Sequence, residues 1–158
     1  MAIYIKFDGI DGKVTAQGHE KWIAVDSLQW GVGRAISSAV GSAKDREASK
    51  PSISEVSITK LMDESSPLIF TEACVGKSKK IDIHLCTVGT DQIDTYMEYV
   101  LEDCMVSGYS VSSGGDRPSE SISLSFTKME MKFIPYDDAG KATSPIPAGY
   151  DMALGKKI

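Results

Sequence analysis

Apolar and polar residues alternate along much of this chain, and this alternation most constrains its fold. The clearest run is residues 121–127, where Ile122, Leu124 and Phe126 are separated by serine or threonine. Successive side chains of a β-strand point to opposite faces, so this run predicts a strand with one apolar face and one hydroxyl face. Shorter stretches with the same period lie at 3–7, 53–60 and 81–85.

Breaks in the alternation predict bends in the strands. Ile23 and Val25 have one parity, whereas Leu28 and Trp30 have the other. A strand keeps its parity unless a β-bulge adds a residue, so the sequence predicts a bulge near residues 26–27. Because bulged strands curve, they favour a barrel over a flat sheet. Equivalent parity changes occur near residues 102–103 and 127–128.

One segment predicts an α-helix. Capping and acidic residues at 63–66 precede Pro67, which fits the first helical turn. Ile69 and Ala73 lie four residues apart and would stack on one side of the helix, which is expected to end at Gly76. The expected fold class is therefore mainly β: an antiparallel β-barrel or curled two-sheet barrel of about eight or nine strands with one flanking α-helix.

The length of the chain fits one domain, so we expect residues 1–158 to form a single β-barrel domain. Residues 35–52 interrupt the alternation with Ala, Ser, Gly and charged residues, which predicts a long extended loop. Loops of this length are usually functional or disordered. From about residue 137 the chain carries Gly and Pro, which predicts an irregular C-terminal tail.

Charge and hydropathy exclude several classes of partner. The net charge of −5 argues against a nucleic-acid partner, which requires a basic surface. No apolar run approaches the ~20 residues of a membrane-spanning helix, so we expect no membrane insertion. Residues 1–8 alternate and do not resemble a signal peptide. Three cysteines, an odd number, favour a reducing compartment over a disulfide framework.

The search for catalytic groups centres on His84 and Cys86. Residues two apart on a strand share a face, so this pair could form half of a zinc site or a thiol–base pair. Cys74 and Cys104 do not complete such a site by their spacing. We instead expect Cys86 to pack as a small apolar residue, His84 to be exposed or hydrogen-bonded, and His19 to be solvated. The sequence thus predicts no catalytic residue, no metal site and no cofactor.

The hydroxyl face of residues 121–127 cannot belong to the core. It is either a solvated outer surface or a wall that lines a passage or meets another subunit. Exposed strand edges invite aggregation, and a closed ring of identical subunits removes that liability. Two other functions remain open from the residues alone: a monomeric β-barrel ligand-binding or adhesive module, and a hydrolase that uses His84 and Cys86.

Several segments, in their order along the chain, resemble one protein family. The similar segments are Ile5–Gly12, Trp30–Val32, Ile58–Lys60, Asp63–Pro67, Leu101–Asp103, Val106–Ser110 and Glu120–Lys128. Together they resemble the haemolysin-coregulated protein (Hcp) family, the tube component of bacterial type VI secretion systems.

This resemblance implies a β-barrel with a flanking helix that assembles as a homo-hexameric ring. Stacked rings would form a hollow tube inside a contractile sheath, tipped by a spike protein, and small effector proteins would bind in the lumen. The protein would lie in the bacterial cytoplasm before firing and then be secreted without a signal peptide. Such a role is structural, so the chain is not expected to be an enzyme.

Two sets of residues are expected to carry this assembly. The 35–52 loop should reach the adjacent ring through charged contacts, which fix register more than affinity and weaken with salt. The expected ring-to-ring residues are Lys44, Asp45, Arg46 and Glu47. The expected lumen-facing residues are Gln29, Ser112 and Ser113.

Overall fold

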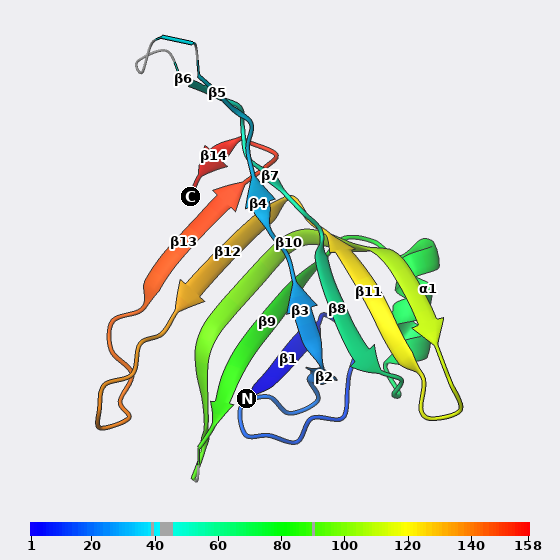
Figure 1. Ribbon diagram of the computed structural model, residues 1–158. Coiled ribbons are helices and arrows are strands. Elements are labelled where there is room, and N and C mark those ends of the chain that lie inside the picture. Colours follow the sequence, from blue (N-terminus) through cyan, green and yellow to red (C-terminus); the bar gives the residue numbers. More distant parts are fainter. Residues whose placement is uncertain (39, 42–45, 90) are drawn as a thin grey trace.

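The computed structural model describes residues 1–38, 40–41, 46–89 and 91–158. These residues form one helix, α1 (Ser66–Val75), and antiparallel strands (Figure 1). The strands are β1 (Ala2–Phe7), β2 (Ile23–Val25), β3 (Ser27–Gln29), β4 (Val32–Gly33), β5 (Ile36–Ser38), β6 (Arg46–Ala48), β7 (Ser52–Ile53), β8 (Val56–Leu61), β9 (Lys79–Val88), β10 (Ile93–Ser112), β11 (Ser119–Ser125), β12 (Lys128–Phe133), β13 (Ile146–Asp151) and β14 (Lys156–Lys157).

The 20-residue strand β10 belongs to two sheets and bends between them. The first sheet has the order β14-β13-β12-β10-β9-β1-β2, and the second has the order β10-β11-β8-β3. The register of β10 shifts between Leu101 and Cys104, and Asp103 has a φ of 54°. The bulge predicted near residues 102–103 is therefore confirmed, and it marks where β10 passes from one sheet to the other.

The parity change near residues 26–27 has a larger consequence than a bulge. Strand β2 pairs with β1 in the first sheet, whereas β3 pairs with β8 in the second. The N–H of Asp26 donates to the carbonyl of Thr59 at 2.8 Å, which holds the crossing point. Because β2 and β3 do not pair with each other, the curled sheets are joined at this edge by the chain and not by a closed hydrogen-bond ladder.

The fold class expected from the sequence, mainly β with antiparallel curled sheets and one flanking helix, is confirmed. The described residues form more strands than the eight or nine expected. The long second strand is divided at its bends, and the segment 35–52 and the C-terminal residues add short strands. The C-terminal residues are thus not all irregular, since β13 pairs with β12 along its whole length.

The hydrophobic core fills the space between the two sheets. It takes the apolar face of β11, as the alternation at residues 121–127 predicts, with Ile122 and Leu124 fully buried. Burying one such side chain stabilises the fold by about 1.5–3 kcal/mol. The other core residues are Ile5, Phe7, Ile10, Ile23, Val25, Val56, Ile58, Ile69, Ile81, Ile83, Leu101, Cys104, Phe126 and Met129.

Helix α1 packs against β10 at the side of the second sheet (Figure 1). Its predicted position is confirmed, with Pro67 in the first turn and Gly76 after the last residue. Ile69 is fully buried on the inner side, whereas Phe70 is 56% exposed. The helix therefore attaches through a narrow contact, and polar groups at its N-terminal end supply much of its remaining anchorage.

The described residues between 31 and 54 form two paired strand segments, called the arm below, that project away from the sheets (Figure 1). Strand β4 pairs with β7 near its base, and β5 pairs with β6 toward its tip. Ser54 and Ser49 fasten the two sides, because each accepts a backbone N–H through its hydroxyl and donates its own N–H across the arm. The segment expected to be a loop thus has β-structure in its described residues.

Candidate functional site

A continuous hydroxyl-rich surface, called the hydroxyl face below, covers the outer side of the second sheet. Strand pairing aligns Ser27, Thr59, Ser121 and Ser110 in one row across β3, β8, β11 and β10. A neighbouring row begins with Gln29 on β3 and continues through β8 and β11. The polar residues of the face are Ser27, Gln29, Ser57, Thr59, Ser110, Ser112, Ser119, Ser121, Ser123 and Ser125. Two exposed apolar residues at its ends, Leu61 and Met105, pair with Ser119 and Ser125.

None of these ten side chains carries a charge, although charged residues make up 25% of the chain. The outer side of the first sheet is different, because Lys128 pairs with Glu102 at 3.3 Å and Lys132 pairs with Glu98 at 3.0 Å. Cross-strand ion pairs are a usual way to solvate an outer sheet face. The two outer faces of one domain therefore have different chemistry, and the hydroxyl face is the uncharged one.

The sequence located part of the hydroxyl face. Gln29 and Ser112 both lie on it and are exposed, at opposite corners of the second sheet. Ser113 lies just beyond the end of β10, where its hydroxyl donates to the carbonyl of Asp116. The contribution of β8 was missed, although Ser57 and Thr59 alternate with Val56, Ile58 and Lys60 in the same way as the serines of β11.

Two of the four expected ring-to-ring residues belong to the described part of the arm. Lys44 and Asp45 fall outside the described residues. Arg46 and Glu47 lie on β6, where their backbones pair with residues 38 and 37 of β5. Their role in contacts between rings stays a prediction.

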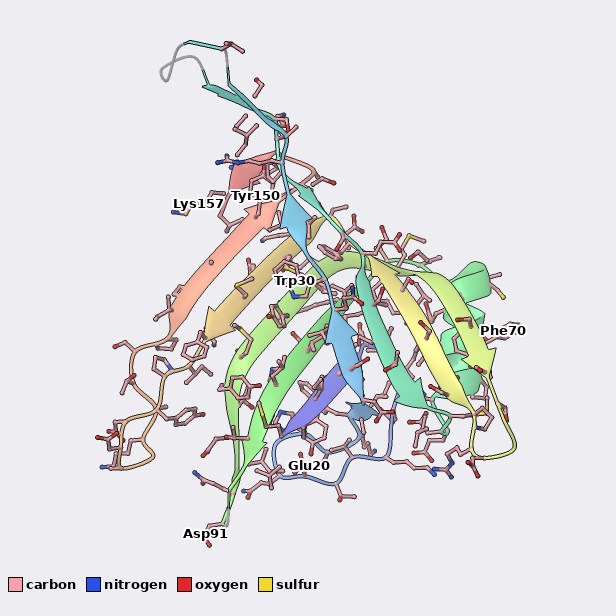
Figure 2. The ribbon with its side chains drawn as sticks, viewed as in Figure 1. Glu20, Trp30, Phe70, Asp91, Tyr150 and Lys157 are labelled. Atoms are coloured by element: carbon pink, nitrogen blue, oxygen red, sulfur yellow. The ribbon has the colours of Figure 1, made fainter. Side chains whose placement is uncertain are left out.

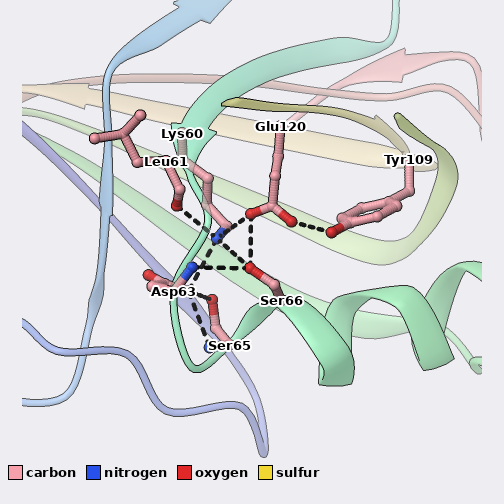
Figure 3. Close-up of polar contacts among 7 residues, drawn as sticks. All are labelled: Lys60, Leu61, Asp63, Ser65, Ser66, Tyr109 and Glu120. Carbon is pink, nitrogen blue, oxygen red and sulfur yellow. Dashed lines mark hydrogen bonds and ion pairs between the residues drawn. The ribbon is translucent and has the colours of Figure 1, made fainter. Parts of the chain in front are cut away.

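A buried ionic network joins the helix to the second sheet (Figure 3). Lys60 Nζ lies 2.6 Å from Glu120 Oε1 and 2.9 Å from Asp63 Oδ1. It also donates to the hydroxyl of Ser66 and the carbonyl of Leu61, both at 3.2 Å. Since Lys60 is on β8, Glu120 on β11 and Ser66 at the start of α1, one ammonium group connects three elements.

The same network reaches β10 through Tyr109, whose hydroxyl donates to Glu120 Oε2. Burial raises the pKa of Tyr109 most, and the hydrogen bond to Glu120 and the charge of Glu120 raise it further, to about 12. The phenol therefore stays protonated and acts as the donor. Asp63 accepts from the N–H and hydroxyl of Ser65, which itself makes no side-chain cap of the helix. Asp63 therefore organises the turn that the sequence assigned to simple helix capping.

The His84–Cys86 pair lies on the outer side of the first sheet, and the structure adds His19 to it. Cys86 is fully buried, and His84 Nδ1 lies 2.9 Å from His19 Nε2. The predictions that Cys86 is packed and His84 hydrogen-bonded are thus confirmed. The prediction that His19 is solvated is wrong, because Trp22 and Tyr4 enclose its ring and leave it 5% exposed.

The environment of Cys86 does not favour a nucleophile. A catalytic thiol needs a lowered pKa, whereas burial raises the pKa of Cys86 despite its contact with Thr95 at 3.4 Å. The other buried thiol, Cys104, has its pKa raised to about 12, chiefly by burial. Within the described ranges, no group of three or more His, Cys, Asp or Glu side chains is placed to hold a metal ion.

An apolar groove lies at the base of the arm, where Figure 2 labels Trp30 and Tyr150. Val32 and Ile53 border it from the arm, and Met129 and Met131 border it from β12. Val32 is 60% exposed, so the groove continues an apolar strip onto the arm.

In the part of the chain that the structure covers, no helix is long and apolar enough to cross a membrane.

Comparison with known proteins gives one consistent result. Residues 4–133 match the family described as "Type VI secretion system effector, Hcp". Protein hcp1 of Pseudomonas aeruginosa is 26% identical over 156 residues, which covers 95% of this chain and 94% of hcp1.

Solved structures agree over nearly the whole chain. A protein described as a type six secretion system protein has 31% identity and a TM-score of 0.91, covering 99% of each chain. Hcp1 from Salmonella typhimurium has 25% identity and a TM-score of 0.76, covering 99% of this chain and 98% of its own. Since the family match spans far more than half of its residues, this chain belongs to the Hcp family of type VI secretion proteins.

Proposed function

We propose that this chain is a tube subunit of a type VI secretion system that closes into hexameric rings. The rings stack into a hollow tube that carries small effector proteins, and the work of the chain is structural and not catalytic. Membership of the Hcp family supports a role in type VI secretion. The hexamer, the stacking and the cargo are the proposal made here.

The observation that carries the proposal is the uncharged hydroxyl face on four strands of the second sheet. We assign this face, including Gln29 and Ser112, to the wall of the channel. A channel lined by one sign of charge concentrates and holds partners of the opposite sign. Short neutral hydroxyls instead keep a hydrated surface of low relief, which lets cargo of either charge pass.

The arm and the groove at its base supply the contacts between chains. A ring of identical subunits needs one surface to meet a different surface of the next copy. The apolar groove at Trp30 and Met131 is an area that a neighbouring chain can cover. The tip of the arm then meets the adjacent ring through the charged segment Lys44–Glu47.

The remaining partners follow from the same assembly. The sheath surrounds the tube and the spike caps it, so subunits gather in the bacterial cytoplasm and leave the cell when the machine fires. No signal peptide is needed on this route. A monomeric ligand-binding or adhesive module would need none of these contacts.

Native mass spectrometry of the purified chain tests the proposal. A ring gives a particle of six chains of 17.0 kDa each. A mass of one or two chains across a range of protein concentrations would contradict the ring and favour the monomeric module.

A further inference from the structure

Residues 13–22, called the clasp below, fold over the outer side of the first sheet. The backbone of the clasp is closed by Lys21, whose N–H donates to the carbonyl of Val14 and whose carbonyl accepts from Gly12, each at 2.8 Å. His19 is the side chain that enters the sheet surface. Its ring centroid lies 5.1 Å from that of Tyr4 on β1 and 5.1 Å from that of His84 on β9.

One hydrogen bond between two imidazoles holds this contact. His19 Nε2 and His84 Nδ1 lie 2.9 Å apart, so one nitrogen donates and the other accepts. His84 Nε2 lies 3.9 Å from a carboxylate oxygen of Glu98, which favours a proton on that nitrogen. His84 Nδ1 is then the acceptor and His19 Nε2 the donor, which leaves His19 Nδ1 without a proton. Both rings are uncharged in this arrangement.

A second proton on His19 has no favourable place. His19 Nδ1 is buried and has no hydrogen-bond partner in the described part of the chain. Cys86 Sγ lies 3.9 Å from Nε2, on the already protonated side, and Trp22 covers both imidazoles with ring centroids at 4.7 and 4.5 Å. A charge placed at Nδ1 is therefore desolvated, which is unfavourable, and the Gln17 backbone offsets this cost only in part.

The nearby acids do not compensate this charge fully. Glu98 already pairs with Lys132 at 3.0 Å, and Asp82 lies 4.0 Å from Lys80. Glu20 is exposed on the clasp. Burial lowers the pKa of His19, opposed by the Gln17 backbone and by the charges of Glu20 and Glu98.

The pKa of His84 is lowered as well. Burial lowers its pKa most, Glu98 and Asp82 oppose this, and His19 and Lys132 add to it. A histidine whose pKa is lowered in the closed state takes up a proton more readily when the segment opens. The closed clasp is therefore fully favoured above the ordinary histidine pKa of about 6.5 and becomes less favoured as the pH falls below it.

We propose that residues 13–22 are an acid-sensitive clasp, closed on the first sheet by uncharged His19 and His84 and opened by their protonation, which uncovers Tyr4 and Cys86. This proposal concerns the single chain and does not depend on ring assembly. Its consequence is that the outer side of the first sheet presents a different surface in neutral and acidic surroundings.

Amide hydrogen exchange of the full-length protein measures the opening. After correction for the intrinsic pH dependence, protection of residues 13–22 should fall by up to about tenfold per pH unit for each proton taken up below about pH 6.5. The amides of β9 and β10 should keep their protection. Protection of the clasp that is unchanged down to about pH 5 would overturn the proposal.

The variant His19→Gln keeps an amide donor for His84 but cannot be protonated at that position. Its clasp should lose the part of the pH dependence that His19 contributes and keep only that of His84, while Asp91→Asn, an exposed change between β9 and β10, should keep all of it. An equal pH dependence in His19→Gln contradicts the proposal.

A second measurement covers the case in which the variant clasp is open at every pH. The chain has two histidines, so exchange of each imidazole C2 hydrogen in the wild type reports each midpoint directly. A midpoint for His19 below its ordinary value supports the proposal, and a midpoint at or above that value overturns it.

Discussion

Lys60 Nζ lies 2.6 Å from Glu120 Oε1, with both side chains fully excluded from solvent. The two residues are direct partners in the pairing of β8 with β11, on the core side of the second sheet. Ser66 and Tyr109 complete the bonding of Glu120, which ties the helix to the sheet behind the hydroxyl face. The shape of the uncharged surface therefore depends on a charge pair buried beneath it.

Removing one partner of this pair should strongly destabilise the fold. Lys60→Met leaves the Glu120 carboxylate buried without its counter-charge, and the free energy of unfolding should fall by about 3–5 kcal/mol. Urea unfolding measures this loss. As a matched control, Lys80→Met removes a lysine that is 60% exposed beside Asp82 and should cost no more than about 1 kcal/mol.

The double variant Lys60→Met with Glu120→Leu distinguishes a buried charge from lost packing. Replacing both charges with apolar groups should recover much of the stability that Lys60→Met loses, since the fully buried carboxylate is gone. Asp63 also loses the Lys60 ammonium, but its side chain is 13% exposed and keeps its bonds from Ser65. If the double variant is as unstable as Lys60→Met, packing of the lysine stem and not the unpaired carboxylate accounts for the loss.

Asp63 should make part of the stability depend on acid. Burial would raise its pKa, but the bonds from Ser65 and Lys60 and the charge of Lys60 outweigh this, so the pKa is lowered. A lowered carboxyl pKa contributes stability above the unfolded value of about 3.9, and the contribution is lost as the pH falls through the folded value. In urea unfolding, the deficit of Asp63→Asn relative to wild type should therefore shrink from about pH 7 to about pH 3. A deficit that does not change with pH contradicts this role.

Gly12 should tolerate no larger residue. A Cβ atom there would lie 2.4 Å from the carbonyl oxygen of Trp22 and 2.7 Å from the Cα of Ile23. Both neighbours are backbone atoms, so Gly12→Ala should cost about 1–3 kcal/mol by overpacking. Gly31→Ala is the matched control because its Cβ would meet nothing within 4 Å. Thermal unfolding of the two variants compares their stability. Equal midpoints would show that the backbone of Trp22 and Ile23 shifts to make room for the added Cβ.

The sequence predicted the strands well because period-two alternation directly reports burial on one face. It also located the bends, since a strand can change the parity of its buried side chains only at a bulge or a break. It could not show that the bend at Asp26 crosses between sheets, because parity carries no information about the partner strand. The burial of Lys60 and Glu120 was missed for a related reason. A charged residue in an alternating strand predicts an exposed side chain, and only the pairing of β8 with β11 shows that these two neutralise each other in the core.

The histidine pair shows a different limit. His84 and Cys86 are close in sequence, so their shared face could be inferred, but His19 is 65 residues away from His84. The polar tract around His19 predicts solvation, and only the folding of residues 13–22 back onto β1 and β9 buries it. Contacts made by a loop that returns over a sheet leave little periodic signal.

The tip of the arm should be needed for stacking and not for ring closure. Deletion of residues 40–49 should leave six-chain particles intact and abolish tubes, since the contacts between rings are assigned to this tip. Electron microscopy together with native mass spectrometry measures both. Normal tubes from the deleted protein contradict the assignment, and loss of the ring itself would place the arm in the contact within a ring.

Bulky residues on the hydroxyl face should block cargo. Gln29→Trp should reduce the amount of effector that copurifies with the rings, because the large indole would project into the channel from a surface of short side chains. Glu130→Trp, on the charged outer side of the first sheet, is the control and should retain normal amounts. Equal retention by both variants would remove Gln29 from the wall of the channel.

We propose above that copies of this chain surround a channel with their hydroxyl faces inward, and cryo-electron microscopy of the assembled particle can show this arrangement. We expect six subunits with Gln29, Ser57 and Ser121 lining the central hole and the Lys132–Glu98 pair facing away from it. A particle of a single chain, or a ring whose inner wall is the charged side of the first sheet, would contradict it.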